Sequence, residues 1–354
     1  DGTWQLDPAS LRFLQLAASA RTLIERRIAQ LDPRTVEVLR VAAVMRGRID
    51  AAQLARVVGS DPEQVQAALD DATLARMIEL DAEGAPRFAH DTIWEVLLSG
   101  MSDDAQRALH QQVVQVLRAR SSPDAEHVFE LARHCAAGLL EQDPRAAFET
   151  LHRAGQLATA ASDDALALTF LQPAARAAQL AAYDPGPSFY AELAEAGLRI
   201  GELDGAFQRF QMAVDRTAPG FERAHLLGRM AWIRHYHADG TPAFHTLRQA
   251  LQECGRSFPD NAAGAFRHVL MLQARRSLNM RSAGARTLRE TELLCGLYGE
   301  LARVCIESSQ VGLAIAAGLC VVSTALDLPE CRARVHAEAL GAFYLAALGA
   351  RARS

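Results

Sequence analysis

The chain has 354 residues, a formal net charge of −5 and 50% hydrophobic residues. Because single cores stop growing near ~250–300 residues, this length predicts two domains or an extended array of repeats. All 37 basic residues are Arg, and the absence of Lys excludes a lysine Schiff base and the lysine of a Walker A phosphate loop. About a fifth of the residues are Ala and only 6% are aromatic, which favours closely packed helices over a sandwich or barrel.

The charge and the cysteine content bear on the partners and the compartment. A net negative charge gives no reason to expect a nucleic acid or an anionic membrane as partner. Six cysteines include no Cys-x-x-Cys pair, which indicates reduced thiols, and no signal peptide or membrane span is visible. We therefore predict a cytoplasmic protein. Because the chain starts at Asp1 and ends within an apparent helix, Val335 to Gly349, we expect it to be a piece of a longer polypeptide.

Residues 1–120 have their own pattern, which changes from a helical period to a strand period and back. The predicted helices cover residues 20–31, a segment that begins at Pro33, Ile49–Val58, Pro62–Met77, Asp91–Leu98 and Asp103–Ala119. A β-hairpin is predicted from Met77 to Leu80 and from Pro86 to Phe88, with its turn at Glu83-Gly84. Three helices followed by a hairpin describe a winged-helix domain. The predicted fold is therefore all-α with one small β-hairpin wing.

Winged helices often bind DNA, and the charge of this segment argues against that function here. Residues 1–120 contain 14 Arg and 17 Asp plus Glu, a net of −3. The helix that would enter a major groove carries Glu63, Asp70 and Asp71 against Arg76. Nucleic-acid affinity depends on cations that meet phosphates, so an acidic recognition helix opposes it. A DNA-binding transcription regulator stays the alternative function.

Five stretches of this segment resemble a known family. They are LIERRIAQLDPRTVEVLRVAAVMRGRID, LARVVG, ALDDATLARMIEL, RFAHDTIWEVLLSGM and ALHQQVVQVL. In order and spacing, from about Leu23 to Leu117, they resemble the winged-helix region of bacterial STAND-type signalling ATPases. Phe88, His90, Trp94 and His110 stand where that family carries its Phe-x-His and Leu-His pairs.

The resemblance implies a position within a larger protein. The family places this winged helix after a P-loop ATPase core and before tetratricopeptide-like repeats. This chain contains no Gly-Lys dipeptide and no Walker motif, so ATP and Mg²⁺ are expected only in an ATPase core outside it, and no cofactor is expected within it. The output domain implied by the resemblance is a kinase, a nucleotide cyclase or a transcription regulator.

Residues 121–354 contain internal repeats of the tetratricopeptide type. The clearest runs from Gly201 to Pro219, with Ala206 and Ala213 at close helix crossings and Phe210 as the bulky plug. The same register recurs at Leu151, Gly155, Ala167, Leu171 and Ala174, at Leu227, Met230, Ala231, Ala243, Leu247 and Ala250, and at Tyr298, Leu301, Ala302, Ala314 and Val321, with a divergent unit before the last. One such unit cannot bury its apolar face alone, so the repeats are expected to stack into an α-solenoid.

In such repeats the first helix of each pair lines an inner groove, which carries over to ten candidate residues. They are Glu149, His152 and Gln156, then Ser188, Glu195 and Arg199, then His225, Trp232, His235 and Tyr236. Trp232 and Tyr236 stand four residues apart on one helical face, an arrangement suited to a peptide or ligand groove. The alternative is that Trp232 fills a gap between repeats.

Other polar residues form weaker candidates. Arg275, Arg276, Arg281, Arg286 and Arg289 form a basic cluster, which is either a solvated surface near Glu290, Glu292 and Glu300 or a patch for an anionic partner. His235 and His237 are two apart, which on a helix does not make a metal site. We expect His90 and His110 to contact each other or to cap a helix, and His134 to be a packing residue.

Together these patterns predict a non-catalytic regulatory fragment. The repeat groove would bind a protein, a peptide or a small ligand, and the winged helix would be an arm toward the ATPase and output domains, which are themselves possible intrachain partners. No catalytic constellation or metal signature is present in the sequence, so we do not expect an enzyme.

Overall fold

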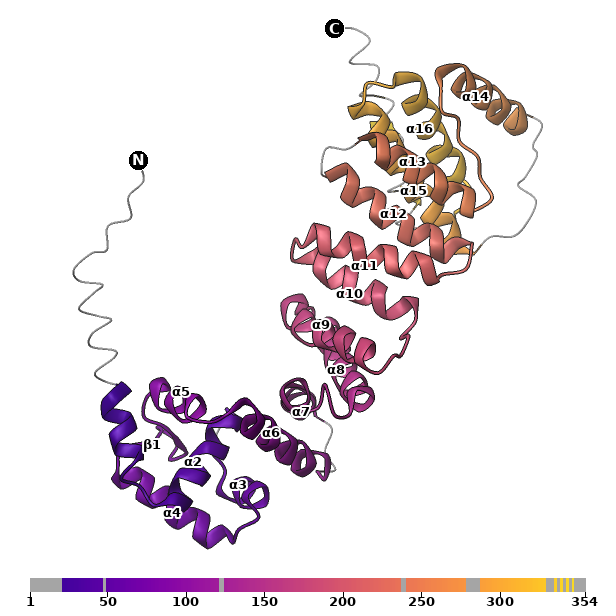
Figure 1. Ribbon diagram of the computed structural model, residues 1–354. Coiled ribbons are helices and arrows are strands. Elements are labelled where there is room, and N and C mark those ends of the chain that lie inside the picture. Colours follow the sequence, from indigo (N-terminus) through magenta and orange to yellow (C-terminus); the bar gives the residue numbers. More distant parts are fainter. Residues whose placement is uncertain are drawn as a thin grey trace, which may run out of the picture. The chain divides into compact units, whose positions relative to one another are not determined.

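The computed structural model describes residues 21–46, 49–120, 124–236, 240–277 and 287–328, and some positions between 334 and 346 (Figure 1). Within these residues the chain is helical apart from one two-stranded antiparallel sheet, as predicted. Its contacts define two compact units, Asp1–Asp184 and Pro185–Ser354. The predicted domain boundary at residue 120 falls inside the first unit and stays a prediction.

The first unit begins with residues 21–28 in a helix and continues with the element order of a winged helix. Its elements are α2 (Pro33–Met45), α3 (Ala51–Val58), α4 (Pro62–Leu74), β1 (Ile78–Leu80), β2 (Pro86–Phe88), α5 (Asp91–Ser99) and α6 (Asp103–Arg118). Asp32, Asp50 and Asp61 cap α2, α3 and α4, because each carboxylate accepts hydrogen bonds from the first-turn amides. With these caps α2 and α4 begin at the predicted Pro33 and Pro62, whereas α3 begins at Ala51, two residues after the predicted Ile49.

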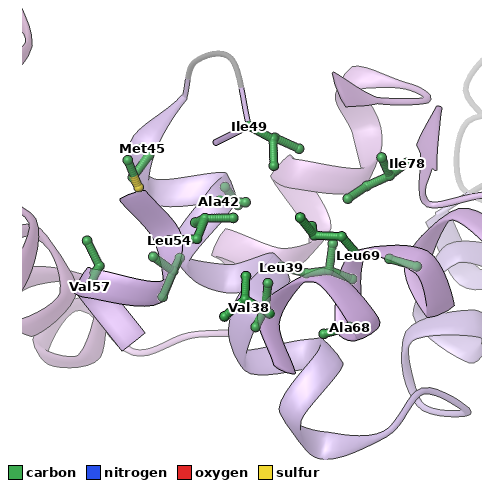
Figure 2. Packing of buried hydrophobic residues seen from close by; sticks show 14 of the residues in the cluster. Val38, Leu39, Ala42, Met45, Ile49, Leu54, Val57, Ala68, Leu69 and Ile78 are labelled. Atoms are coloured by element: carbon green, nitrogen blue, oxygen red, sulfur yellow. The ribbon is translucent and has the colours of Figure 1, made fainter. Parts of the chain in front are cut away.

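The core of this segment is built from the apolar stripes of α2, α3 and α4. Figure 2 shows Leu39 of α2, Leu54 of α3 and Leu69 of α4 within one cluster, together with Ile78 of β1. The predicted helix Pro62–Met77 ends early, at Leu74, because the backbone turns left-handed at Arg76 (φ 56°). Met77 is then fully buried beside the hairpin, in which Ile78 pairs with Phe88.

The remaining helices of the first unit are α7 (Ala125–Gly138), α8 (Pro144–Ala160) and α9 (Asp164–Leu180). Helix α7 packs against both α6 and α8, and α8 and α9 form a hairpin. Two glycines permit these close approaches. A Cβ at Gly138 would lie 2.8 Å from the His110 Cβ of α6, and a Cβ at Gly155 would lie 2.5 Å from Leu171 Cδ2 of α9.

The second unit starts with two tetratricopeptide-like helix pairs (Figure 1). They are α10 (Pro187–Arg199) with α11 (Leu203–Arg216), and α12 (Phe221–Tyr236) with α13 (Gly240–Glu253). Gly201 makes the turn of the first pair with φ 89°, and Ala206, Phe210 and Ala213 are fully buried, as predicted. Helix α11 packs against α12, so the two pairs stack as successive repeats.

The end of the repeat region differs from the predicted succession of helix pairs. It contains α14 (Ala262–Ser277), α15 (Leu288–Glu307) and α16 (Val311–Ala325). Helix α15 pairs with α16 but also packs directly against α12 and α13, whereas α14 packs against α16. In the described residues, the divergent repeat expected before Tyr298 is therefore one helix, α14. The stack itself continues from α12 and α13 directly to α15.

The predicted compartment depends on the state of the cysteines and on the length of the apolar helices. Cys135, Cys254, Cys295, Cys305 and Cys320 are buried free thiols, and Cys331 lies outside the described residues. In the described part of the chain, no helix combines the length and the apolar character that crossing a bilayer requires.

Candidate functional site

The predicted groove residues of the second unit lie on one stripe of each first helix. Ser188, Glu195 and Arg199 follow one face of α10, at spacings of seven and four residues. Ser188 and Arg199 are exposed, and Glu195 is half-buried. On α12, His225 is exposed at the start of the corresponding stripe.

Trp232 and Tyr236 form an aromatic stack on α12. Their ring centroids lie 5.5 Å apart with an interplanar angle of 21°. Tyr236 is 68% exposed, although a tyrosine ring is largely apolar, and Trp232 is half-buried. The spacing of four residues predicts this contact, and the structure places it on the surface of the repeat.

Glu195 is joined to a residue that the sequence patterns missed, Arg229 of α12. Arg229 Nε donates to Glu195 Oε1 at 2.6 Å, and Arg229 Nη2 donates to Oε2 at 2.8 Å. This two-point geometry is the strong form of an arginine–carboxylate pair. Since His225, Arg229, Trp232 and Tyr236 share one helical face, the ion pair lies on the same stripe as the aromatic stack.

His235 does not belong to this open surface. Its side chain is only 10% exposed, and its Nε2 lies 3.0 Å from Glu307 Oε2 of α15. His235 therefore links α12 to the next stacked helix. His237, for which no shared metal site with His235 was expected, lies outside the described residues.

The three candidates on α8 form a separate group in the first unit. Glu149 Oε1 accepts from Arg145 Nε at 2.9 Å, and His152 Nε2 lies 3.2 Å from Gln156 Nε2. The His152 ring also lies 5.4 Å from the ring of Phe148. Glu149, His152 and Gln156 share one face of α8.

The basic cluster is only partly described. Arg281 and Arg286 lie outside the described residues, as do the side chains of Arg275 and Arg276, which belong to α14, while Arg289 is exposed. Two of the carboxylates expected near the cluster have other partners. Glu290 Oε2 accepts from the Thr287 amide in a capping box, and Glu300 pairs with Arg303.

The first unit contains a site that sequence reasoning did not identify, where α6 and α7 meet. His110 Nδ1 lies 2.8 Å from His134 Nδ1, and the two rings are 5.0 Å apart. Burial, and secondarily the charge of Arg46, lowers the pKa of His110 to about 4. Burial, with His110 and Arg133 as further causes, lowers the pKa of His134 to about 3. Both imidazoles are thus neutral at neutral pH.

This pair corrects two expectations about the histidines. His110 contacts His134, not His90. His90 occupies the N-cap position of α5 but its side chain makes no capping hydrogen bond, and it is exposed. The contact brings together residues 24 positions apart, so no local spacing could have indicated it.

Two cavities lie beside this site, one lined by His110 and the other by both His110 and His134. One, of about 330 Å³, includes Asp103, Arg107, Glu141 and Arg176 among its lining residues. The other, of about 360 Å³, is bounded by α2, α5, α6, α7 and α9. Its lining residues are Val44, Met45, Arg46, Leu98, Gln106, His110, Arg133, His134, Ala136, Ala137, Thr169 and Phe170.

No protein-family model and no curated protein matches the chain. Among solved structures, it is similar to a Signal Transduction ATPase with Numerous Domains (STAND) protein with a tetratricopeptide repeat sensor from Pyrococcus horikoshii. The identity is 11% and the TM-score 0.39, and the match covers 94% of this chain but 54% of that one. BtubC from P. vanneervenii is 14% identical, with coverages of 87% and 95% and a TM-score of 0.33. The tetratricopeptide domain of P58(IPK) is 12% identical, with coverages of 80% and 87% and a TM-score of 0.28.

The chain spans about half the length of the first of these proteins. Identities and TM-scores are low throughout. The tetratricopeptide-like fold is therefore assigned from the helix pairing within this chain.

Proposed function

We propose that this chain is a non-catalytic regulatory module that binds a protein or peptide segment on the repeat surface of α10 and α12. We define this interaction surface by Glu195, Arg199, His225, Arg229, Trp232 and Tyr236. The observation that carries the proposal is the stack of the half-buried Trp232 ring with the exposed Tyr236 ring. Rigid aromatic side chains supply large contact areas at a low cost in conformational entropy, and they dominate many interfaces.

The ion pair strengthens this interpretation. Glu195 and Arg229 hold the surfaces of two successive repeats in a defined relation, since both hydrogen bonds require the guanidinium plane to face the carboxylate. The aromatic stack therefore projects from a fixed scaffold. A partner that meets a preformed surface loses less entropy on binding.

The chemistry of the buried thiols agrees with a non-catalytic role. Burial raises the pKa of Cys295, Cys305 and Cys320 to about 12, with Asp327 contributing at Cys295. A thiol attacks as its thiolate, so these groups are poor nucleophiles at neutral pH.

The finer proposal concerns the parent protein. The resemblance of residues 23–117 to STAND-type ATPases supports a regulator that couples the repeat surface to an ATPase core and to a kinase, cyclase or transcription-regulator output outside this chain. A partner that binds one arrangement more tightly than another would shift the equilibrium between closed and active states.

The test is capture of a partner from native lysate by the 354-residue chain. The Trp232→Ala, Tyr236→Ala double variant should lose the partner that the wild type retains. Phe266→Ala on α14 is a matched control, because Phe266 is 66% exposed and Tyr236 is 68% exposed. Equal capture by the double variant, with unchanged helicity, would move the interaction away from α12.

A further inference from the structure

The cavity of about 360 Å³ in the first unit has an apolar wall. Val44 and Met45 of α2, Leu98 of α5 and Phe170 of α9 contribute to it, and Val44 and Phe170 are buried. Phe170 is also held by a parallel stack with Phe129 of α7, with centroids 5.6 Å apart. The volume falls within the range of pockets that hold small organic molecules, roughly 300–1,000 Å³.

The charged side chains that line this cavity all have one sign. Arg46 follows the C-terminus of α2 and Arg133 belongs to α7, and the described lining residues include no Asp or Glu. The central carbon of the Arg46 guanidinium lies 4.3 Å from the centroid of the Trp94 ring. The neighbouring cavity differs, because Asp103 and Glu141 accompany its arginines. The positive charge at this cavity favours an anion.

The histidine pair adds polar groups of defined character. A hydrogen bond between the two Nδ1 atoms requires one imidazole to donate and the other to accept. In the neutral pair, the donor ring then has a bare Nε2 and the acceptor ring carries an Nε2–H. The pair therefore offers one N–H donor and one lone pair in addition to the guanidinium groups.

We propose that this cavity binds a small amphipathic carboxylate, whose anionic head meets Arg46 and Arg133 and whose short hydrocarbon tail meets the apolar wall. Arginine is suited to the head, since its guanidinium donates to both carboxylate oxygens. The tail gains free energy from the removal of apolar surface from water. This inference is independent of the interaction surface on α10 and α12.

Such a ligand would contact the winged-helix segment and the first repeat helices at once. The lining residues come from α2 and α5 of the winged-helix segment and from α7 and α9 of the following helices, as well as from α6. A carboxylate bound there favours the arrangement in which these helices surround the cavity. The site would then report the presence of the ligand within the first unit.

The test is isothermal titration calorimetry of the 354-residue chain with octanoate, 1-octanol and acetate at pH 7.5. Octanoate has both the head and the tail, whereas each of the other two probes has one of them. We expect octanoate to bind about tenfold more tightly than 1-octanol, which corresponds to one hydrogen-bonded charge. Octanoate should also bind more tightly than acetate, because acetate lacks the tail that buries apolar surface. Equal affinity for octanoate and 1-octanol, or no octanoate binding in the millimolar range, would overturn the proposal.

Variants separate the cavity from unspecific binding of an amphiphile. Arg133→Gln removes an exposed cation of the cavity and should weaken octanoate binding about tenfold. Arg153→Gln is the matched control, since Arg153 is an exposed arginine on α8 of the same unit and lines neither cavity. Ala136→Leu, which narrows the cavity, should weaken the binding of octanoate but leave the melting temperature of the chain unchanged. An identical effect of Arg133→Gln and Arg153→Gln would contradict the site.

Discussion

Arg229 and Glu195 form a two-point ion pair, with hydrogen bonds of 2.6 and 2.8 Å, between the first helices of two successive repeats. Arg229 precedes Trp232 by three residues, so the ion pair and the aromatic stack occupy one face of α12. The Arg229 side chain is 33% exposed and that of Glu195 is 25% exposed, so water screens this pair only in part.

A double-mutant cycle on this pair measures how firmly it joins the repeats. We expect Glu195→Gln and Arg229→Gln to show a coupling of about 1 kcal/mol in the free energy of unfolding, because the pair is bidentate and partly buried. The comparison is the single-bond pair Arg145–Glu149, whose side chains are 49% and 61% exposed. An exposed pair four residues apart on a helix contributes about 0.3–0.5 kcal/mol. Equal coupling energies for the two pairs would contradict a firm link between the repeats through Glu195 and Arg229.

Gly155→Ala tests the close crossing of α8 and α9. The new Cβ would lie 2.5 Å from Leu171 Cδ2 and 2.6 Å from its Cγ, and Leu171 is fully buried. Overpacking of this kind lowers stability by about 1–3 kcal/mol, which exceeds the gain of up to ~1 kcal/mol from helix propensity. At Gly296 a Cβ meets nothing within 4 Å, so Gly296→Ala should stabilise the chain. Thermal unfolding should show a lower melting temperature for Gly155→Ala and a higher one for Gly296→Ala. A higher melting temperature for Gly155→Ala would contradict the close crossing of α8 and α9.

The buried histidine pair predicts a pH dependence of stability. Folding lowers the pKa of His110 and of His134 from 6.5 to about 4 and about 3. Below about pH 6.5 the unfolded chain therefore binds more protons than the folded chain. The free energy of unfolding is at its full value above that pH and declines as the pH falls toward 4. The loss of stability between neutral pH and pH 5 is on the order of 2 kcal/mol per histidine.

Urea unfolding at several pH values checks this dependence. His134→Gln stays neutral throughout, so its stability should change less between pH 7 and pH 5 than that of the wild type. The facing charges are the cations Arg46 and Arg133, which further oppose protonation of the pair. An unchanged slope in the variant would show that the pair is not held neutral.

Duplex DNA should not bind to the winged-helix segment. On α4, Glu63, Asp70 and Asp71 are exposed, and on the hairpin Arg87 is paired with Glu79 at 2.5 Å. Because affinity for DNA arises mainly from cations that displace counterions, this surface is unsuited to phosphate contacts. An electrophoretic assay with a random duplex at ~150 mM salt should show no shift. A salt-dependent shift would favour the transcription-regulator alternative.

Local sequence patterns were sufficient to predict most of the elements. Pro33 and Pro62 indicated the starts of α2 and α4, and the small residues around Phe210 indicated the pairing of α10 with α11. The aromatic stack followed from the spacing of Trp232 and Tyr236. Each of these features depends on residues that lie within one or two helical turns of each other, and over that range the spacing of residues in the sequence indicates the structure.

Features that depend on distant residues were not predictable in this way. The pairing of Arg229 with Glu195 depends on the register between repeats, and that of His110 with His134 depends on the α6–α7 crossing at Gly138. The direct packing of α15 on α13 likewise joins helices that are not successive in the chain, since α14 packs against α16. None of these relations has a local period that a single sequence displays.

The most direct test of the interaction surface is hydrogen–deuterium exchange of the chain with and without its captured partner. The proposed function predicts slower exchange of backbone amides in α10 and α12, and no such protection for the Trp232→Ala, Tyr236→Ala variant. Protection confined to α4 and the hairpin, or to α14, with α10 and α12 unchanged, would contradict it.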